Sequence, residues 1–368
     1  MARQALLKCV LGALLLGLIP LAAFEVWLRG HLFDRVAYSN SAAIDAQLRA
    51  RDAQGPWNVM FVGDSEVRWG IDPAAVDAGA SAAGAPAYRT FNHAFDGFGA
   101  SWWLRLLPAL LRDPSLAHVD TVVLGVQLID LHRTLPVSGM SCGSLQQPVL
   151  TSSFAIDHGW ESLCRDRSWD ARLGRDLFDD LWTVRYASAV RSLVLPGHQV
   201  LAMNSRSLRA PERGFQAHRP IAQDPESYAD EFARWKAQYK PARDFVPLPA
   251  GAWEQLVRQG GFFDELESVT RASGKRLALF ALPTNPVVID TFRRRDDYQA
   301  NSRLLAQWAA AHRVPYVDLG IQDRADSDTF FSDMRHLSGP GATVYSRDLG
   351  AALVKAGLQV ASSTQAAK

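Results

Sequence analysis

Short apolar runs alternate along the chain with segments that have helical spacing of apolar residues. The run at 119–131 is long enough to be buried on both faces, as strands of parallel sheets are. Because strands separated by helices join through parallel crossovers, the pattern predicts an α/β fold with a doubly wound, five-stranded parallel sheet. The expected strands are residues 57–63, 87–95, 119–131, 275–283 and 314–320.

Helix signals lie between these runs. Asp72 and Pro73 suit the cap and the first position of a helix. Further helices are expected after Phe95, near Phe262 and over 294–312, and a last helix is expected after "SGPGA", residues 338–342.

One connection is far longer than a crossover needs. More than a hundred residues separate His132 from the helix expected near Phe262, whereas a crossover takes about a dozen. Structureless loops of that length are uncommon in compact domains. The sequence therefore predicts a subdomain inserted after the third strand, at about 133–255.

The N-terminus has a different composition from the rest. Residues 9–28 are apolar except for Glu25, and at ~1.5 Å per residue they match the thickness of a bilayer. We expect a membrane anchor in residues 1–30, followed by a linker over 31–56. A cleaved signal peptide is the alternative, but cleavage after Ala23 would place Leu21 where a small residue is wanted.

Charge and cysteine content narrow the class of protein. The chain has 39 basic and 38 acidic residues, for a net charge of +1, which gives no support for a nucleic-acid partner. No histidine or cysteine spacing indicates a metal, so no cofactor is expected. Cys142 and Cys164 fit one disulfide in an oxidising compartment, with two independent buried thiols as the alternative.

The first expected strand ends in "MFVGDSEVRW", residues 60–69, which places Ser65 on the turn that follows it. Open α/β sheets build their sites at the carboxyl ends of their strands. Ser65 is therefore a candidate nucleophile. The alternative is a turn that only caps the next helix, since Asp64 and Ser65 are both favoured capping residues.

A candidate base follows the fifth expected strand, in "FFSDMRHLSGPGA". Asp333 precedes His336 by three residues, a spacing that puts carboxylate and imidazole on the same side of a turn. Asp333 can then hold one ring nitrogen while the other faces outward as a base. Both residues belong to the same sheet edge as Ser65, so the sequence predicts that the three lie together.

The chain resembles the SGNH, or GDSL-type, hydrolases. Four segments, "FVGDSE", "FNHAFDGFG", "LGVQ" and "SDMRHLSGPGA", occur in the order and at the sheet positions of that family's four blocks. The resemblance implies a flavodoxin-like SGNH catalytic domain over 57–368. It does not cover the insertion.

The resemblance also implies a role for each block. Ser65 would attack an ester carbonyl, His336 would take its proton, and Asp333 would hold the imidazolium. The oxyanion hole would combine the backbone N–H groups of Ser65 and Gly97 with the side-chain amide of Gln127. Gly97 is favoured over Gly99. Gln127 stands where the family has asparagine, so it either donates to the oxyanion or only packs at the strand end.

The anchor, the insertion and "LPTNP" after the fourth strand resemble one branch of this family more loosely. Its members are exported, membrane-tethered proteins that work beside a membrane-bound O-acyltransferase and acylate polysaccharides. This likeness implies a single-pass inner-membrane protein with a periplasmic catalytic domain that transfers an acetyl group to a polysaccharide acceptor. The alternatives are a carbohydrate esterase of the same fold and a non-catalytic subunit of a polysaccharide modification or export complex.

Overall fold

The computed structural model describes residues 16–28, 51, 55–129, 213, 251–291, 293–323, 330–333 and 335–360. The chain divides into two compact units. Residues 16–28 belong to one, and all other described residues belong to the second. Nearly all of the predicted linker, most of the predicted insertion, and the pair Cys142 and Cys164 lie outside the described residues.

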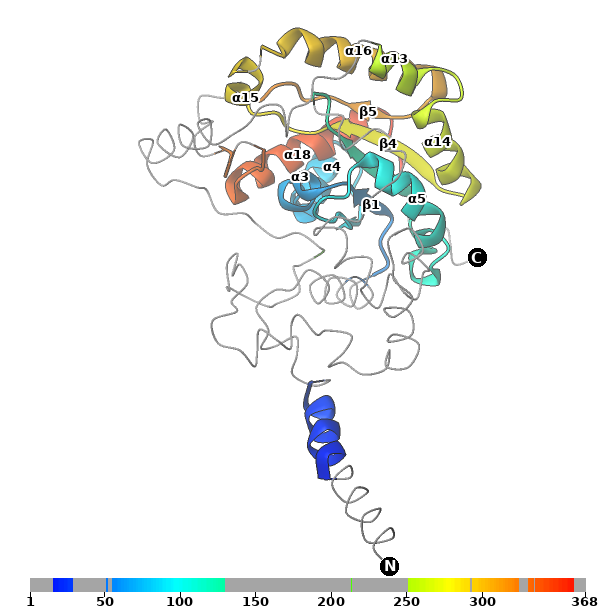
Figure 1. Cartoon of the computed structure of the whole chain (residues 1–368). Coiled ribbons are helices and arrows are strands. Elements are labelled where there is room, and N and C mark those ends of the chain that lie inside the picture. Colours follow the sequence, from blue (N-terminus) through cyan, green and yellow to red (C-terminus); the bar gives the residue numbers. More distant parts are fainter. Residues whose placement is uncertain are drawn as a thin grey trace, which may run out of the picture. The chain divides into compact units, whose positions relative to one another are not determined.

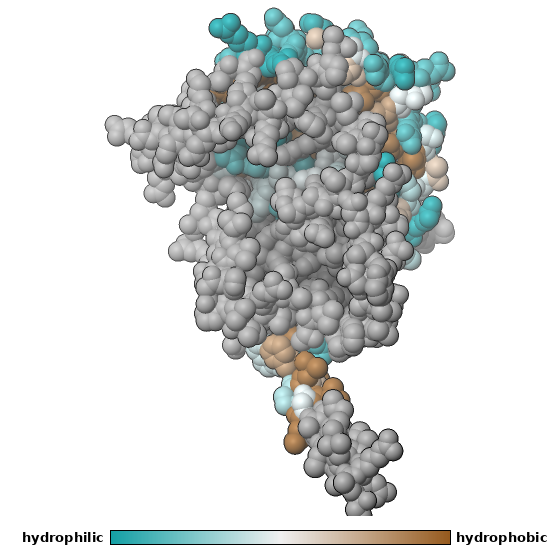
Figure 2. All heavy atoms as spheres, viewed as in Figure 1, coloured by the Kyte–Doolittle hydropathy of each residue, from teal (hydrophilic) through white to brown (hydrophobic). Residues whose placement is uncertain are grey.

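The described part of the first unit is helical and apolar. Several of its large apolar side chains are exposed, and Figure 2 shows exposed apolar residues there in brown, whereas Leu28 is fully buried. Within the described residues, no helix combines the length and the apolar character that crossing a membrane requires. The exposed apolar side chains of this helix are Leu16, Leu18, Ile19, Leu21 and Val26.

The second unit is built around one five-stranded sheet (Figure 1). The strand order is β2-β1-β3-β4-β5, and every neighbouring pair is parallel. This confirms the predicted α/β class and the five parallel strands, and the order is that of flavodoxin-like sheets. The strands are β1 (Val59–Val62), β2 (Thr90–Asn92), β3 (Thr121–Val126), β4 (Arg276–Ala281) and β5 (Tyr316–Val317).

Both faces of the sheet are buried. Val59 and Phe61 of β1 belong to a core cluster that includes Tyr345 of α18 (Gly339–Lys355). Met60 and Val62 alternate with them and point to the opposite face, yet they are also fully buried. Helices therefore cover the sheet on both sides, as a doubly wound fold requires.

The helices form two packed groups. On one side, α18 packs against α4 (Pro73–Ala82). The other group runs through successive contacts from α5 to α14, α13 and α16. The predicted end of the insertion at about residue 255 falls inside α13, a helix of this second group. Its bounds and those of its neighbours are α5 (Ala100–Leu110), α13 (Ala252–Val257), α14 (Phe262–Ala272) and α16 (Arg295–His312).

Two helix starts illustrate how capping sets the boundaries. Asp72 caps α4 as predicted, because its Oδ1 accepts a hydrogen bond from the N–H of Ala74 at 3.0 Å. The start expected for the last helix, after residue 342, is wrong because the helix begins earlier. It begins at Gly339, inside "SGPGA", because Ser338 accepts from the N–H of Gly341 and Pro340 suits the first turn.

Glycines allow α4 and α18 to approach closely. A Cβ atom at Gly79 would lie 1.9 Å from the carbonyl oxygen of Arg347, and one at Gly350 would lie 2.2 Å from that of Val76. No side chain larger than hydrogen fits at either position, because the obstacle is backbone. These contacts fix α18 against α4, and α18 directly follows the segment that carries His336.

Candidate active site

Ser65 is the first residue of α3 (Ser65–Gly70), which is separated from the end of β1 by two residues, Gly63 and Asp64. Asp64 caps the helix by accepting from the N–H of Glu66 at 2.9 Å. The turn is tight. A Cβ atom at Gly63 would lie 2.2 Å from Cγ2 of Val67, so only glycine fits between β1 and α3. Ser65 is partly exposed at the carboxyl edge of the sheet.

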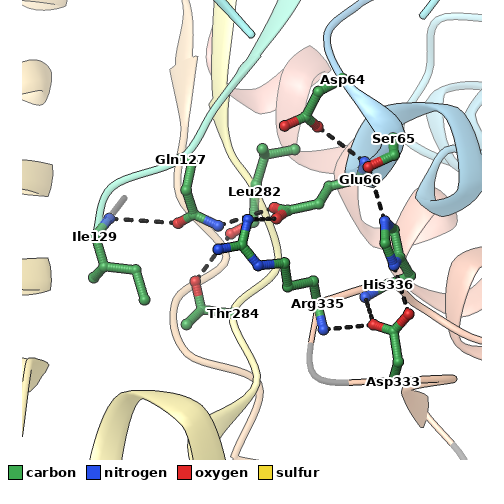
Figure 3. A network of polar contacts seen from close by, with 10 residues as sticks. All are labelled: Asp64, Ser65, Glu66, Gln127, Ile129, Leu282, Thr284, Asp333, Arg335 and His336. Atoms are coloured by element: carbon green, nitrogen blue, oxygen red, sulfur yellow. Dashed lines mark hydrogen bonds and ion pairs between the residues drawn. The ribbon is translucent and has the colours of Figure 1, made fainter. Parts of the chain in front are cut away.

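Asp333, His336 and Ser65 form a continuous hydrogen-bonded chain (Figure 3). Nδ1 of His336 lies 2.6 Å from Oδ2 of Asp333, and its Nε2 lies 2.9 Å from Oγ of Ser65. Because a carboxylate only accepts, Nδ1 donates to Asp333, and Nε2 of the neutral ring accepts the serine proton. The structure thus brings together the three residues that the sequence placed at one edge.

The side chain of Asp333 holds the backbone of the loop that carries His336. Oδ1 of Asp333 accepts from the N–H groups of both Arg335 and His336, each at 2.7 Å. A bridge between Phe331 and Leu337 closes the loop. The imidazole is therefore fixed before any ligand binds.

The charges at the site favour an ion pair between Asp333 and His336. Burial opposes ionisation of the Asp333 carboxyl, but the hydrogen bonds and charge of His336 outweigh it and lower its pKa to about 2. Burial likewise opposes the charged imidazole. Asp333, with smaller contributions from Glu66 and Asp64, nevertheless raises the pKa of His336 above its ordinary value. The site therefore stabilises a proton on His336.

Asn92, at the end of β2, holds the far end of α3. Its Nδ2 donates to the carbonyl oxygens of Val67 and Ile71, each at 2.9 Å. The Asn92 side chain is fully buried. A six-residue helix has little stability of its own, so this cap from a neighbouring strand helps to fix the orientation of Ser65. This role could not be predicted, because nothing near Asn92 in the chain indicates that its side chain binds α3.

The segment after β2 carries Gly97 and is tied to α3. The carboxylate of Asp96 accepts hydrogen bonds from Nη1 of Arg68 and from Nε1 of Trp69, both at 3.1 Å. Gly97 has φ +79°, a left-handed conformation that favours glycine, whereas Gly99 caps α5 in an extended conformation. Asp96 thus fixes the turn at Gly97 relative to the helix that begins with Ser65.

Gln127 follows β3 and contacts α3 directly. Its Nε2 donates to Oε2 of Glu66 at 2.9 Å, and its Oε1 accepts from the N–H of Ile129 at 3.4 Å (Figure 3). A carboxamide has two N–H donors, so the bond to Glu66 uses one of them. The oxyanion role predicted for Gln127 stays a prediction.

Arg335 was also missed as a candidate. Its Nη1 lies 3.7 Å from Oε1 of Glu66, and Figure 3 shows its guanidinium pointing toward Glu66 and Thr284. The sequence offers no signal for this pair, because Glu66 and Arg335 look like ordinary charged residues beside Ser65 and His336. Only the fold brings them together.

Within the part of the chain that the structure describes, no three His, Cys, Asp or Glu side chains are grouped so that they could hold a metal ion. Neither a comparison with protein-family models nor a search of curated proteins gave a match. The chemistry assigned to this site therefore rests on its geometry and on the sequence motifs.

Proposed function

We propose that the protein transfers acyl groups through a covalent intermediate on Ser65. In the first step Oγ of Ser65 forms a bond to the acyl carbon while its proton passes to Nε2 of His336. The tetrahedral intermediate then expels the leaving group, which takes that proton. In the second step an acceptor hydroxyl attacks the acyl-enzyme, gives its proton to His336, and Oγ of Ser65 recovers it.

The observation that carries this proposal is the hydrogen-bonded chain from Asp333 through His336 to Ser65. A serine hydroxyl is a weak nucleophile unless a base stands within hydrogen-bond reach, and the base in turn needs a partner that orients it. Both conditions hold here at distances of 2.9 and 2.6 Å. The raised pKa of His336 supports its role as the proton acceptor.

An oxyanion hole belongs to the same proposal. We assign it to the backbone N–H groups of Ser65 and Gly97 and to the amide N–H of Gln127 that does not bind Glu66. The three residues follow β1, β2 and β3, neighbouring strands whose carboxyl ends share one edge. This arrangement and the position of His336 before α18 support assignment of the chain to the SGNH fold. They agree with the resemblance of its four sequence segments to the blocks of that family.

The finer proposal is that the acyl acceptor is a polysaccharide. We propose an exported O-acyltransferase, tethered at the inner membrane by residues 1–30, that receives an acetyl group through a membrane-bound O-acyltransferase partner. The apolar stretch at 9–28 and the looser family likeness support this assignment. Hydrolysis by a carbohydrate esterase would use the same acyl-enzyme, with water as the acceptor.

Two experiments test the proposal in turn. Ser65→Ala removes the nucleophile and should abolish turnover of p-nitrophenyl acetate, with unchanged circular dichroism. Ser81→Ala, an exposed serine on α4, is the matched control and should keep full activity. Retention of most of the activity by folded Ser65→Ala protein would refute the serine mechanism and favour a non-catalytic binding role.

The acceptor is tested with the full-length protein and an activated acetyl donor. Mass spectrometry of an oligosaccharide panel gives the transfer yield, and released acetate gives the hydrolysis yield. We expect transfer to exceed hydrolysis. If no oligosaccharide gains acetyl groups while a pre-acetylated glycan is deacetylated, the protein is an esterase and the transferase proposal is wrong.

A further inference from the structure

Two segments far apart in the chain are joined twice at the candidate site. Ser65 contacts His336, and the next residue on α3, Glu66, faces the residue before His336, Arg335, at 3.7 Å. The second contact is well shielded from solvent, since the side chains of Glu66 and Arg335 are 1% and 17% exposed. An ion pair between a buried carboxylate and a partly buried guanidinium thus runs beside the hydrogen bond between Ser65 and His336.

The same carboxylate makes a third connection. Oε2 of Glu66 accepts from the amide of Gln127, while Oε1 faces Arg335. Glu66 therefore links α3 to the end of β3 and to the loop that carries His336. A carboxylate removed from water is costly unless it is paired and hydrogen bonded, and Gln127 and Arg335 supply both.

These contacts matter because α3 is short. Asp64 and Asn92 bind its backbone at the two ends, but rotation of the helix about its axis is limited by the side chains that its faces present. The side chain of Glu66, next to Ser65, contacts both Gln127 at the end of β3 and Arg335 in the loop that carries His336. A small rotation of α3 would move Oγ of Ser65 away from Nε2 of His336.

We propose that Glu66 is a positioning residue: by binding Gln127 and Arg335 at once, it sets the orientation of Ser65 relative to His336. The proposal rests on the acyl-transfer function proposed above. Glu66 acts through Ser65 and His336 and does not itself act as the base, because its carboxylate already binds Gln127 and Arg335. The contact with Glu66 also gives Gln127 a positioning role that is separate from the oxyanion hole.

The charge of Glu66 has a measurable second effect. The negative groups that raise the pKa of His336 are Asp333 on its own loop, Glu66 on α3 and Asp64 at the N-cap of α3. Gln127, which follows β3, is neutral, and Arg335 carries the opposing positive charge. Removing the charge of Glu66 while keeping its shape, in Glu66→Gln, should therefore lower the pKa of His336.

The kinetic test compares Glu66→Ala and Glu66→Gln with wild type in the full-length protein, using p-nitrophenyl acetate. We expect Glu66→Ala to lower kcat by about 10- to 100-fold, since small misplacement of reacting groups costs this much, with KM within about twofold. Glu66→Gln keeps the shape and an oxygen that accepts from Gln127, so it should retain more activity. If Glu66→Ala does not fold, the test uses the isosteric Glu66→Gln instead. Its kcat should still lie below that of wild type.

Asp77→Asn is the matched control. Asp77 is also an ion-paired carboxylate, bound by Arg213 and by the N–H of Thr90 at the start of β2, at the opposite edge of the sheet. Its variant should lose thermal stability without losing kcat. Equal loss of kcat in Asp77→Asn and Glu66→Ala would mean that the effect is general destabilisation, and the proposal would fall.

A double-mutant cycle separates the two tasks of Gln127. Because Gln127 is also assigned to the oxyanion hole, Gln127→Ala should still lower kcat once Glu66 is alanine, but by a smaller factor than it does when Glu66 is present. Full additivity of the two losses would show that Glu66 and Gln127 act independently, against the proposal.

The last measurement does not depend on turnover. In full-length protein labelled at Cε1 of histidine, the His336 resonance, assigned by its absence in His336→Gln, should titrate at lower pH in Glu66→Gln than in wild type. If wild type shows no turnover, the proposed function fails, whatever the titration shows. If wild type turns over but Glu66→Ala keeps wild-type kcat and the His336 titration does not move, the positioning proposal alone fails.

Discussion

Oγ of Ser65 lies 2.9 Å from Nε2 of His336, although 271 residues separate the two in the chain. The parallel sheet makes this contact possible, because the carboxyl ends of parallel strands share one edge. Ser65 follows β1, and His336 lies between β5 and α18. Asp333 then orients the ring from the other side at 2.6 Å.

The pH dependence of the rate should follow His336. The neutral imidazole is the form that accepts the serine proton, so kcat/KM should fall as pH falls through the pKa of His336, which is raised above its ordinary value by Asp333. Asp333 is the strongest of the groups that raise this pKa. Asp333→Asn should therefore move the acid limb to lower pH and reduce kcat by about 10⁴-fold. An acid limb at the same pH in both proteins would contradict this assignment.

Gly97→Ala tests the turn after β2. Alanine is strained by roughly 1–2 kcal/mol in the left-handed conformation that Gly97 adopts at φ +79°. The shift of the backbone should misdirect the Gly97 N–H, and kcat should fall by about 100-fold, as expected for loss of one oxyanion donor.

Gly84→Ala is the control for that strain. Gly84 has φ +92° at the end of α4, with open space where a Cβ would lie. Its variant should lose similar stability in urea unfolding but keep kcat. Equal kcat values for the two variants would show that the Gly97 N–H does not contribute to the oxyanion hole.

Gly79→Ala tests the packing that places α18. Its Cβ would lie 1.9 Å from a backbone carbonyl oxygen of α18, and overpacking of this kind costs about 1–3 kcal/mol or more. Urea unfolding should show that loss, while the exposed Ser81→Ala on the same helix should unfold like wild type. A Gly79→Ala protein as stable as wild type would mean that α4 and α18 are not packed this closely.

The sheet and the three residues of the serine–histidine–aspartate chain could be predicted because their signals are local. Apolar runs mark the buried strands, and "GDSE" and "SDMRH" each follow a strand. Parallel connection then places both segments at one edge. The cap at Asp72 is equally local, since the side chain and the N–H that it accepts from are two residues apart.

The supports of the site could not be predicted because their partners are distant in sequence. Asn92 binds carbonyl groups of α3 from another strand, and Glu66 meets Gln127 and Arg335 only in the folded chain. From the sequence, Glu66 looks like an acidic residue in the first turn of a helix, a position that usually faces water. Its burial follows from the close packing of α3 against the ends of β1 and β3, where Gly63 and Gly125 leave room for Val67.

The central claim is that Ser65 is a nucleophile activated by His336, and covalent labelling tests it most directly. The full-length protein is treated with a fluorophosphonate, which reacts with activated serines, and digested with trypsin. We expect one adduct, on Ser65 in the peptide of residues 52–68, and none in His336→Ala. Folded wild-type protein that gains no adduct on Ser65, or that labels equally well without His336, would contradict it.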